Sequence, residues 1–382
     1  RYGKEEVETW FFEVWNEPDL KTPFFDGTQE DYFRLYEITA KAVKAVDDKL
    51  KVGGPATSNS KWVAAFVDYC KVHDAPVDFI TTHQYAGDPI SEVCDQKDAD
   101  HMKDTAEIQA EYKVDFAQLF AGLKPEDGLL PMFRRTMPDN TETDDLNRDL
   151  LRDAAEQVQK QADGLPVYYT EWNGCATFGA PGNDTRKVAA YDMRAALSAE
   201  DFIDGSSIWC FSDIFEEIHP FPEEFHGGYG LVTQHGIAKP LFHALRLLGQ
   251  AGDKRLELPG ALDGEVSVAA FRDAADTQLT VLANLHHFAG QSTPATPVEI
   301  EVELGAKPQS VQLCRIDEEH GNPLKCWQAM GEPEDMTPAQ VQQVIDESAV
   351  DYAPAPYEYA DGKLTVKTEL VTNDLAFIRI VK

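Results

Sequence analysis

The sequence lacks a hydrophobic run that could cross a membrane, and it lacks the paired cysteines of a thiolate metal site. No apolar stretch approaches the roughly 18 residues that a membrane span needs. The chain of 382 residues has six cysteines, and none of them forms a C-x-x-C pair. This disfavours a zinc–thiolate centre. So few cysteines in a chain of this length are also compatible with a reducing compartment such as the cytoplasm.

Basic residues are scarce as well. The chain has 34 lysines and arginines against 67 aspartates and glutamates, which gives a net charge of −33. This excess of negative charge argues against nucleic acids and anionic membranes as partners. A hydrophobic content of 43% indicates a globular protein, and the length is sufficient for two domains.

Strand-like and helix-like patterns alternate strictly through the first 250 residues. The strand-like stretches are residues 10–15, 51–56, 77–85, 165–174 and 206–213. Such alternation predicts an α/β fold with a parallel sheet and crossover helices. Five strands are fewer than the eight of a closed barrel. We therefore predict that residues 1–250 form a (β/α)8 TIM barrel that is N-terminally incomplete in this chain, with about three βα units missing before Arg1.

The pattern changes after residue 250. In "VEIEVEL", at residues 298–304, apolar side chains alternate with glutamates. A period of two indicates half-buried antiparallel strands. Residues 251–382 are therefore predicted to form an all-β, sandwich-like accessory domain. The stretch "GNPLKCWQAMGEP", at residues 321–333, is predicted to be an irregular excursion within that domain.

Two glutamates end predicted strands in similar surroundings. Glu17 lies in "VWNEP" and Glu171 lies in "YYTEWNG", and each has an aromatic residue and an asparagine beside it. A barrel brings the carboxyl ends of its parallel strands to one face, so these side chains are expected to meet there. A buried carboxylate is either a satisfied structural group or a working acid. Two such groups at one face are what glycoside hydrolysis requires.

Five stretches of the sequence carry a family resemblance. They are "VWNEPDL", "THQY", "YTEWNG", "IWCFSDIFEE" and "FHGGYGLVTQHGIAKP". In this order and spacing they resemble glycoside hydrolase family 39, the β-xylosidase branch. The stretch "RIDEEHGNPLKCWQAMGEP" is similar to the accessory domain of that family. The resemblance covers nearly the whole chain and begins at the fourth barrel strand.

The resemblance implies a retaining double displacement on β-D-xylosides that releases xylose from xylo-oligosaccharides. It assigns Glu17 as the general acid/base and Glu171 as the nucleophile that forms a covalent glycosyl-enzyme. Asn16 would bind the 2-hydroxyl group of the substrate near the nucleophile. The acid role requires Glu17 to carry a proton while Glu171 is charged, and like charges in one site favour that division.

Three more residues are placed in the sugar subsite by the same resemblance. His83 and Tyr85 would contact the sugar, with Tyr85 near the nucleophile. Their structural alternative is a core histidine and a packing tyrosine. Trp209 would be the apolar floor on which the sugar ring stacks, and its alternative is a buried core tryptophan.

Glu216 and Glu217 would bind the outer hydroxyl groups of xylose through charge-assisted hydrogen bonds. They would also crowd the space that the hydroxymethyl group of a hexose needs. Their structural alternative is a solvated acidic loop. The stretch "EEIHPFPEEFH" contains two E-x-x-H spacings, which di-iron proteins use on helices. Pro220 and Pro222 would break such helices, so this stretch is not expected to bind metal. Nothing else in the sequence implies a metal or an organic cofactor.

Other functions remain open from the sequence. An α-L-iduronidase-like enzyme of the same family would share both carboxylates, but its uronate substrate should meet a cationic clamp, and "SDIFEE" is acidic. A non-enzyme alternative is an incomplete barrel that binds sugar or a partner without activity. The family resemblance also leaves room for a homo-oligomer.

Overall fold

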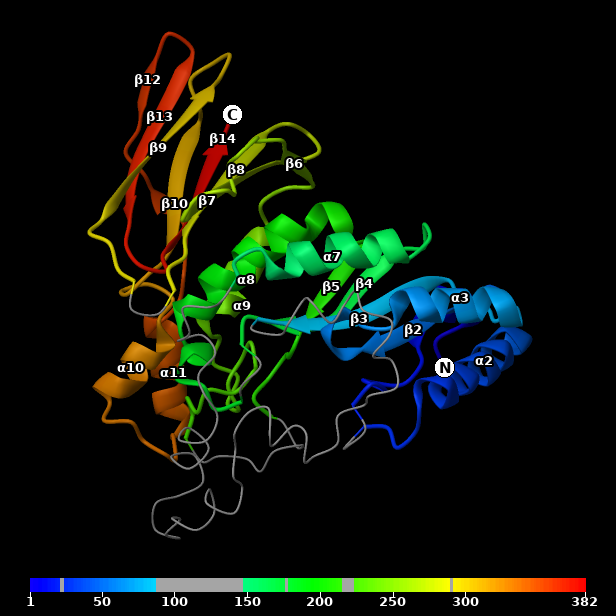
Figure 1. Cartoon of the computed structure of the whole chain (residues 1–382). Helices are drawn as coiled ribbons and strands as arrows, with labels where there is room; N and C mark the ends of the chain where they lie inside the picture. The colour runs from blue at the N-terminus through cyan, green and yellow to red at the C-terminus, as the bar shows by residue number, and fades with distance from the viewer. Residues whose placement is uncertain (21–23, 87–146, 176–177, 215–222, 289–290) are drawn as a thin grey trace. The chain divides into compact units, whose positions relative to one another are not determined.

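The computed structural model describes residues 1–20, 24–86, 147–175, 178–214, 223–288 and 291–382 (Figure 1). These residues divide into two compact units. The first unit contains residues 1–20, 24–86, 149–173 and 198–209, and the second contains residues 147–148, 174–175, 178–197, 210–214, 223–288 and 291–382. The two units interleave along the sequence. A domain boundary at residue 250 stays a prediction.

The first unit is built on a five-stranded parallel sheet. Its strands are β1 (Phe11–Glu13), β2 (Lys51–Thr57), β3 (Phe79–Tyr85), β4 (Val167–Asn173) and β5 (Gly205–Ile208). They lie side by side in sequence order, and each neighbouring pair is parallel. The five strands expected from the sequence are therefore present and ordered as in part of a barrel. Closure into eight strands stays a prediction.

Helices of the first unit accompany this sheet. They are α1 (Lys4–Val7), α2 (Gln29–Val46), the short 3-10 helix η1 (Ser58–Ser60), α3 (Val63–His73), α7 (Leu150–Gln161) and the 3-10 helix η7 (Glu200–Phe202). Helix α2 begins at a capping box, in which Thr28 accepts a hydrogen bond from the Asp31 backbone N–H. Its buried face meets α3, where the rings of Tyr36 and Phe66 lie 4.5 Å apart (Figure 1).

The second unit contains two antiparallel sheets. The larger sheet has the order β11-β10-β14-β8-β7-β6, and the smaller has the order β12-β13-β9. The strands are β6 (Lys254–Leu256), β7 (Val266–Arg272), β8 (Gln278–Leu285), β9 (Thr296–Glu303), β10 (Ser310–Ile316), β11 (Ala353–Pro354), β12 (Glu358–Ala360), β13 (Lys363–Leu370) and β14 (Leu375–Val381). One hydrophobic core joins side chains of both sheets, including Val281 and Ile378 from the larger and Ile300 and Val366 from the smaller. The alternating pattern of residues 298–304 thus buries one face of β9, as expected.

Helices also belong to the second unit. They are the 3-10 helix η6 (Pro181–Asp184), α8 (Arg186–Ala199), α9 (Pro240–Leu248), α10 (Pro323–Ala329) and α11 (Pro338–Glu347). None of the helices in the described part of the chain combines the length and the apolar character that a bilayer crossing requires. The prediction of an irregular excursion at residues 321–333 was wrong, because α10 occupies much of it. Asn322 caps that helix by accepting a hydrogen bond from the Lys325 backbone N–H, and Pro323 follows at the first helical position.

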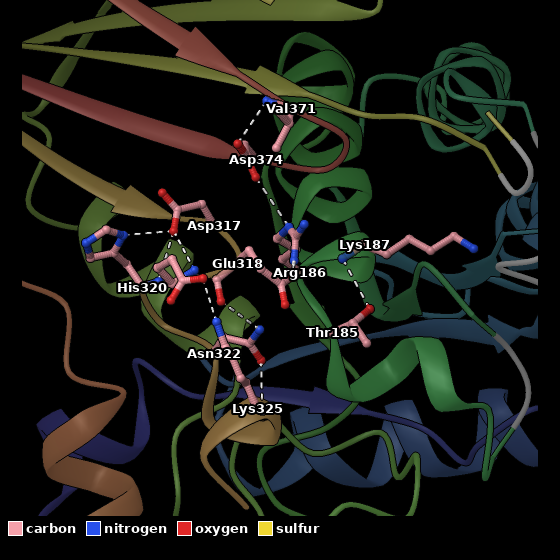
Figure 2. A network of polar contacts seen from close by, with 11 residues as sticks. Thr185, Arg186, Lys187, Asp317, Glu318, His320, Asn322, Lys325, Val371 and Asp374 are labelled. Atoms are coloured by element: carbon pink, nitrogen blue, oxygen red, sulfur yellow. Dashed lines mark hydrogen bonds and ion pairs between the residues drawn. The ribbon is translucent and has the colours of Figure 1, made fainter. Parts of the chain in front are cut away.

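An ion-pair network joins the start of α8 to loops of the β-sheet region within the second unit. The Arg186 guanidinium lies between the carboxylates of Glu318, at 2.5 Å, and Asp374, at 3.3 Å (Figure 2). Asp374 also accepts a hydrogen bond from the Val371 backbone N–H. The side chain of Asp374 is buried, so this end of the network is shielded from salt more than its exposed end at Glu318.

A fully buried lysine joins three segments of the second unit. The Lys239 ammonium lies 2.7 Å from carboxylate oxygens of both Asp184 and Asp213, and it donates to the Gly228 carbonyl at 3.0 Å. Burial opposes its charge, but the two carboxylates outweigh burial and raise the pKa of Lys239. Asp213 in turn accepts the Gly230 backbone N–H. The cluster therefore ties the segment just before residues 215–222 to the segment just after them.

Replacing Lys239 with methionine should lower the free energy of unfolding by about 3–5 kcal/mol, because two buried carboxylates would lose their shared cation. Urea denaturation of the whole chain measures this. Lys367→Met is the matched control, since Lys367 is exposed on the same unit and pairs with Glu299 at 3.5 Å; it should change stability by less than about 1 kcal/mol. Equal stability of the two variants would contradict the assignment.

Candidate active site

Glu17 follows β1 on a backbone that is sharply bent. Both Trp15 and Glu17 have positive φ angles, 71° and 43°, which non-glycine residues rarely adopt. The bend is held because the Glu17 backbone N–H donates to the Ala56 carbonyl at 2.8 Å. Glu17 is 8% exposed. Strained backbone of this kind persists where the surroundings fix it, and it gathers at functional sites.

The other central residues come from two neighbouring strands. His83 and Tyr85 lie at the end of β3, and Glu171 lies in β4. In the parallel register His83 is opposite Glu171, and Tyr85 is opposite Asn173. A register shift between Thr82 and His83 accompanies this pairing. All these residues and Glu17 belong to the first unit, so the ends of three strands bring them together as the sequence predicted.

The side chains of these residues contact one another directly. Nδ1 of His83 lies 2.9 Å from Oε1 of Glu17 and 3.7 Å from Oε2 of Glu171. The Tyr85 hydroxyl donates a short hydrogen bond to Oε1 of Glu171. One oxygen of Glu17 and one oxygen of Glu171 lie within 4.8 Å of each other. The two carboxylates thus have different hydrogen-bond partners: His83 for Glu17 and Tyr85 for Glu171.

The charge of the carboxylates acts on the imidazole between them. His83 is 2% exposed, and this burial alone would lower its pKa. The hydrogen bond with Glu17 and the charges of Glu171 and Glu17 outweigh burial and raise the pKa of His83 above 6.5. The site therefore favours a proton on the imidazole.

Glu17, His83 and Glu171 also form the kind of cluster that could hold a metal ion. Two ligands on one tetrahedral zinc ion, each about 2.1 Å from it, lie about 3.4 Å apart. Nδ1 of His83 and Oε1 of Glu17 are closer, at 2.9 Å. That distance is the usual length of an N–H···O hydrogen bond. The spacing thus fits a shared proton better than it fits two ligands of a tetrahedral zinc ion.

Asn16 and Trp209 are the other predicted sugar contacts within the described residues. Asn16 is exposed beside Glu17. Trp209 is half-buried, and its carbonyl accepts a hydrogen bond from Nδ2 of Asn173 at 2.6 Å. This bond ties Trp209 to the end of β4, two residues beyond Glu171. Contact of Asn16 and Trp209 with a sugar stays a prediction.

Glu216 and Glu217 lie outside the described residues, as do both prolines of the E-x-x-H stretch. The residues that follow them are held closely. Gly227 has a φ of 79° and donates its N–H to Asp184, and a Cβ there would lie 2.4 Å from the Ala180 carbonyl oxygen. A side chain at position 227 is thus excluded both by the backbone angle and by space.

A buried acid that was not predicted from the sequence fixes the turn after Glu17. Asp19 is 6% exposed, and its carboxylate accepts hydrogen bonds from the Ser58 backbone N–H at 2.8 Å and from the Ser58 hydroxyl. These bonds fasten the turn after Glu17 to η1. The stretch "NEPDL" does not indicate this role, because the partner of Asp19 lies 39 residues away in the sequence.

A second group of buried hydrogen bonds links η1 to β3 and β4. The Ser60 hydroxyl makes hydrogen bonds with the Tyr169 hydroxyl at 2.9 Å and with Oε1 of Gln84 at 3.0 Å. All three side chains are buried. They connect η1, β3 and β4, through the residue that follows His83 and the residue two positions before Glu171. The sequence offered no signal for this group, because its members are far apart along the chain.

Asp19 should make stability depend on pH. Burial raises its pKa to about 6 from 3.8, although the charge of Lys61 and the bonds from Ser58 oppose this. The folded state then holds the proton more tightly than the unfolded state. Asp19 therefore adds up to about 3 kcal/mol to the free energy of unfolding. This contribution is complete below about pH 4 and is lost as the pH rises through about 6.

As the pH rises from 4 to 7, the free energy of unfolding of Asp19→Asn should therefore fall less than that of the wild-type chain. Denaturant titrations at several pH values measure the difference. Asp361→Asn, at an exposed turn, is the matched control and should follow the wild-type curve. Parallel curves for wild type and Asp19→Asn would show that Asp19 titrates normally.

Paired carboxylates at the ends of parallel strands form the arrangement that glycoside hydrolases use. Comparison with known proteins agrees with this class. The sequence model of the glycosyl hydrolases family 39 matches residues 1–121 and 132–365. The chain belongs to this family, as the sequence motifs indicated.

The chain is similar in sequence to named enzymes and in structure to a solved member of the family. It is 32% identical over 355 residues to a β-xylosidase of Caldicellulosiruptor saccharolyticus, covering 91% of this chain and 63% of the relative. A crystal structure of a family 39 enzyme from Xanthomonas axonopodis pv. citri matches 100% of this chain and 70% of that chain, with a TM-score of 0.73 and 26% identity. More distantly, an α-L-iduronidase of Mus musculus is 22% identical over 423 residues, covering 100% of this chain and 59% of the relative.

The chain spans less than two thirds of the length of both named sequence relatives. It combines a TIM-barrel-like α/β part with β-sheets.

Proposed function

We propose that this chain carries the catalytic pair of a retaining glycosidase that releases xylose from β-D-xylosides and xylo-oligosaccharides. The observation that carries the proposal is the contact of Glu17, His83, Tyr85 and Glu171 at the ends of three parallel strands. Oxygens of the two glutamates within 4.8 Å support retention. Retaining pairs are about 5–5.5 Å apart, and inverting pairs are about 6.5–9.5 Å apart.

The proposed reaction has two displacements. In the first, a Glu171 oxygen attacks the anomeric carbon while Glu17 gives its proton to the departing glycosidic oxygen. In the second, Glu17 takes a proton from water, the water oxygen bonds to the anomeric carbon, and the bond to Glu171 breaks. Tyr85 would hold the Glu171 carboxylate in its attacking position, because its hydroxyl already donates to Oε1.

A neutral pentose fits the charges around the site better than a uronate. Glu216 and Glu217 follow Trp209 closely in the sequence, and their charges would repel a substrate carboxylate. The same two glutamates would bind the hydroxyl groups of xylose and leave little room for the extra carbon of a hexose. The preference for xylosides over α-L-iduronides therefore rests on Glu216 and Glu217.

A panel of p-nitrophenyl glycosides tests the proposal. The folded chain is assayed on the β-D-xyloside, the β-D-glucoside and the α-L-iduronide, with Glu171→Gln as the matched inactive variant. We expect p-nitrophenol release from the xyloside alone, and none from Glu171→Gln. Activity on another glycoside instead would overturn the xylosidase assignment while keeping the carboxylate pair.

Size-exclusion chromatography accompanies the assay to show whether the chain associates, because aromatic side chains in β1 and just after it are exposed. Phe11 is 48% exposed although its ring contacts Phe79 and Tyr168, and Trp15 is 52% exposed. A folded chain that hydrolyses no glycoside would favour the alternative in which the sheet binds sugar or further polypeptide without turnover.

A further inference from the structure

His83 is much closer to one catalytic carboxylate than to the other. Its Nδ1 lies 2.9 Å from Glu17 and 3.7 Å from Glu171. The nearer contact has hydrogen-bond length and the farther does not. Glu171 receives its own hydrogen bond from Tyr85. The imidazole is therefore the partner of the acid/base residue, and the phenol is the partner of the nucleophile.

The direction of the His83–Glu17 bond follows from the charges around the imidazole. An ionised Glu17 can only accept, so the bond then requires a proton on Nδ1. Glu171 and Glu13 act on the ring in the same sense as Glu17, because all three carboxylates favour a proton on it. The ring is also nearly closed off from water. These conditions favour a hydrogen on Nδ1, directed at Oε1 of Glu17.

We propose that His83 is a positioning residue for the acid/base carboxyl group, whose Nδ1–H holds Oε1 of Glu17 so that Oε2 exchanges the proton with the leaving group. This inference rests on the proposed function. As the glycosidic bond breaks, the proton passes from Oε2 to the departing oxygen and Glu17 becomes a carboxylate. The Nδ1–H of His83 stabilises that new charge until water returns a proton in the second displacement.

A role confined to sugar binding gives a different signature. A sugar contact acts on the xylose ring, which is the same in every xyloside, so its loss affects all xylosides alike. A contact to the acid/base group matters only when the leaving group needs a proton. Phenol needs one, whereas 2,4-dinitrophenol departs readily as the anion. The ratio of kcat/KM between these two xylosides therefore separates the two roles, and it is independent of how much protein is folded.

The test uses three variants of the whole chain. His83→Ala removes the donor, and we expect kcat/KM on phenyl β-D-xyloside to fall about 10- to 100-fold, with a change of less than about 3-fold on the dinitrophenyl xyloside. His83→Asn places an amide N–H near the position of Nδ1 and should recover most of the loss. His83→Gln places its amide near Nε2 and should not. Equal losses on both xylosides, or equal rescue by Asn and Gln, would overturn the proposal.

An NMR titration tests the pair without any turnover. The His83 imidazole is followed by histidine-selective spectra in the wild-type chain and in Glu17→Gln. Removing the Glu17 carboxylate should lower the pKa of His83, because its hydrogen bond and its charge both raise that pKa. Tyr85→Phe is the control, since Tyr85 contacts Glu171 and should leave that pKa nearly unchanged. An unchanged pKa in Glu17→Gln would overturn the pairing, whereas a wild-type chain that cleaves no xyloside would count against the proposed function alone.

Discussion

Glu171→Ala should remove nearly all hydrolysis of β-D-xylosides, with kcat/KM falling by about 10^4-fold or more. The variant lacks the oxygen that attacks the anomeric carbon, and no neighbouring group described in the site replaces it. Both activated and unactivated xylosides should be affected, because every leaving group needs the attack. Initial rates on p-nitrophenyl and dinitrophenyl β-D-xylosides measure the loss.

Added azide provides the stereochemical control for this variant. The anion would occupy the space left by the missing carboxylate and attack from the face opposite the leaving group, so the product should be the α-xylosyl azide. A β-xylosyl azide, or a loss smaller than about 100-fold, would mean that Glu171 is not the nucleophile.

Glu17→Ala should show a loss that depends on the leaving group. On phenyl β-D-xyloside kcat/KM should fall by about 10^2- to 10^4-fold, which is the usual contribution of a general acid. On the dinitrophenyl xyloside the first displacement should remain fast, because its leaving group needs no proton. The second displacement then becomes slow, so the covalent intermediate should accumulate and appear as a burst of dinitrophenol.

Added azide distinguishes Glu17→Ala from Glu171→Ala. It should speed the second displacement by taking the place of water, which needs a base, and the product should be the β-xylosyl azide. If Glu17→Ala lost activity equally on both leaving groups and gave no burst, Glu17 would be a structural residue.

The strands could be predicted because their sequence patterns are strong. Residues 77–85 and 165–174 are apolar and bounded by turn signals, and β3 and β4 lie within them. The order of the parallel strands followed from the alternation with helices. The two helices of residues 323–347 were missed, although Asn322 and Thr337 each precede a proline and cap a helix. Those capping signals were outweighed by the surrounding strand pattern.

The meeting of Glu17 and Glu171 could also be predicted, because both end parallel strands. What the sequence could not supply is how the side chains are paired. His83 and Tyr85 are two residues apart on one strand, yet the first bonds Glu17 and the second bonds Glu171. That division depends on the bend at Trp15 and Glu17 and on the register shift before His83, which no local pattern encodes. Asp19 was missed for a related reason, since its partner Ser58 is 39 residues away.

The stereochemistry of the first sugar released tests the central claim most directly. Proton NMR follows the anomeric signal during early hydrolysis of p-nitrophenyl β-D-xyloside, before the free xylose mutarotates. Two displacements through Glu171 require the β anomer of xylose to appear first, followed by slow conversion to the α anomer. If the α anomer appeared first, water would have attacked directly, and the assignment of Glu171 as the nucleophile would be wrong.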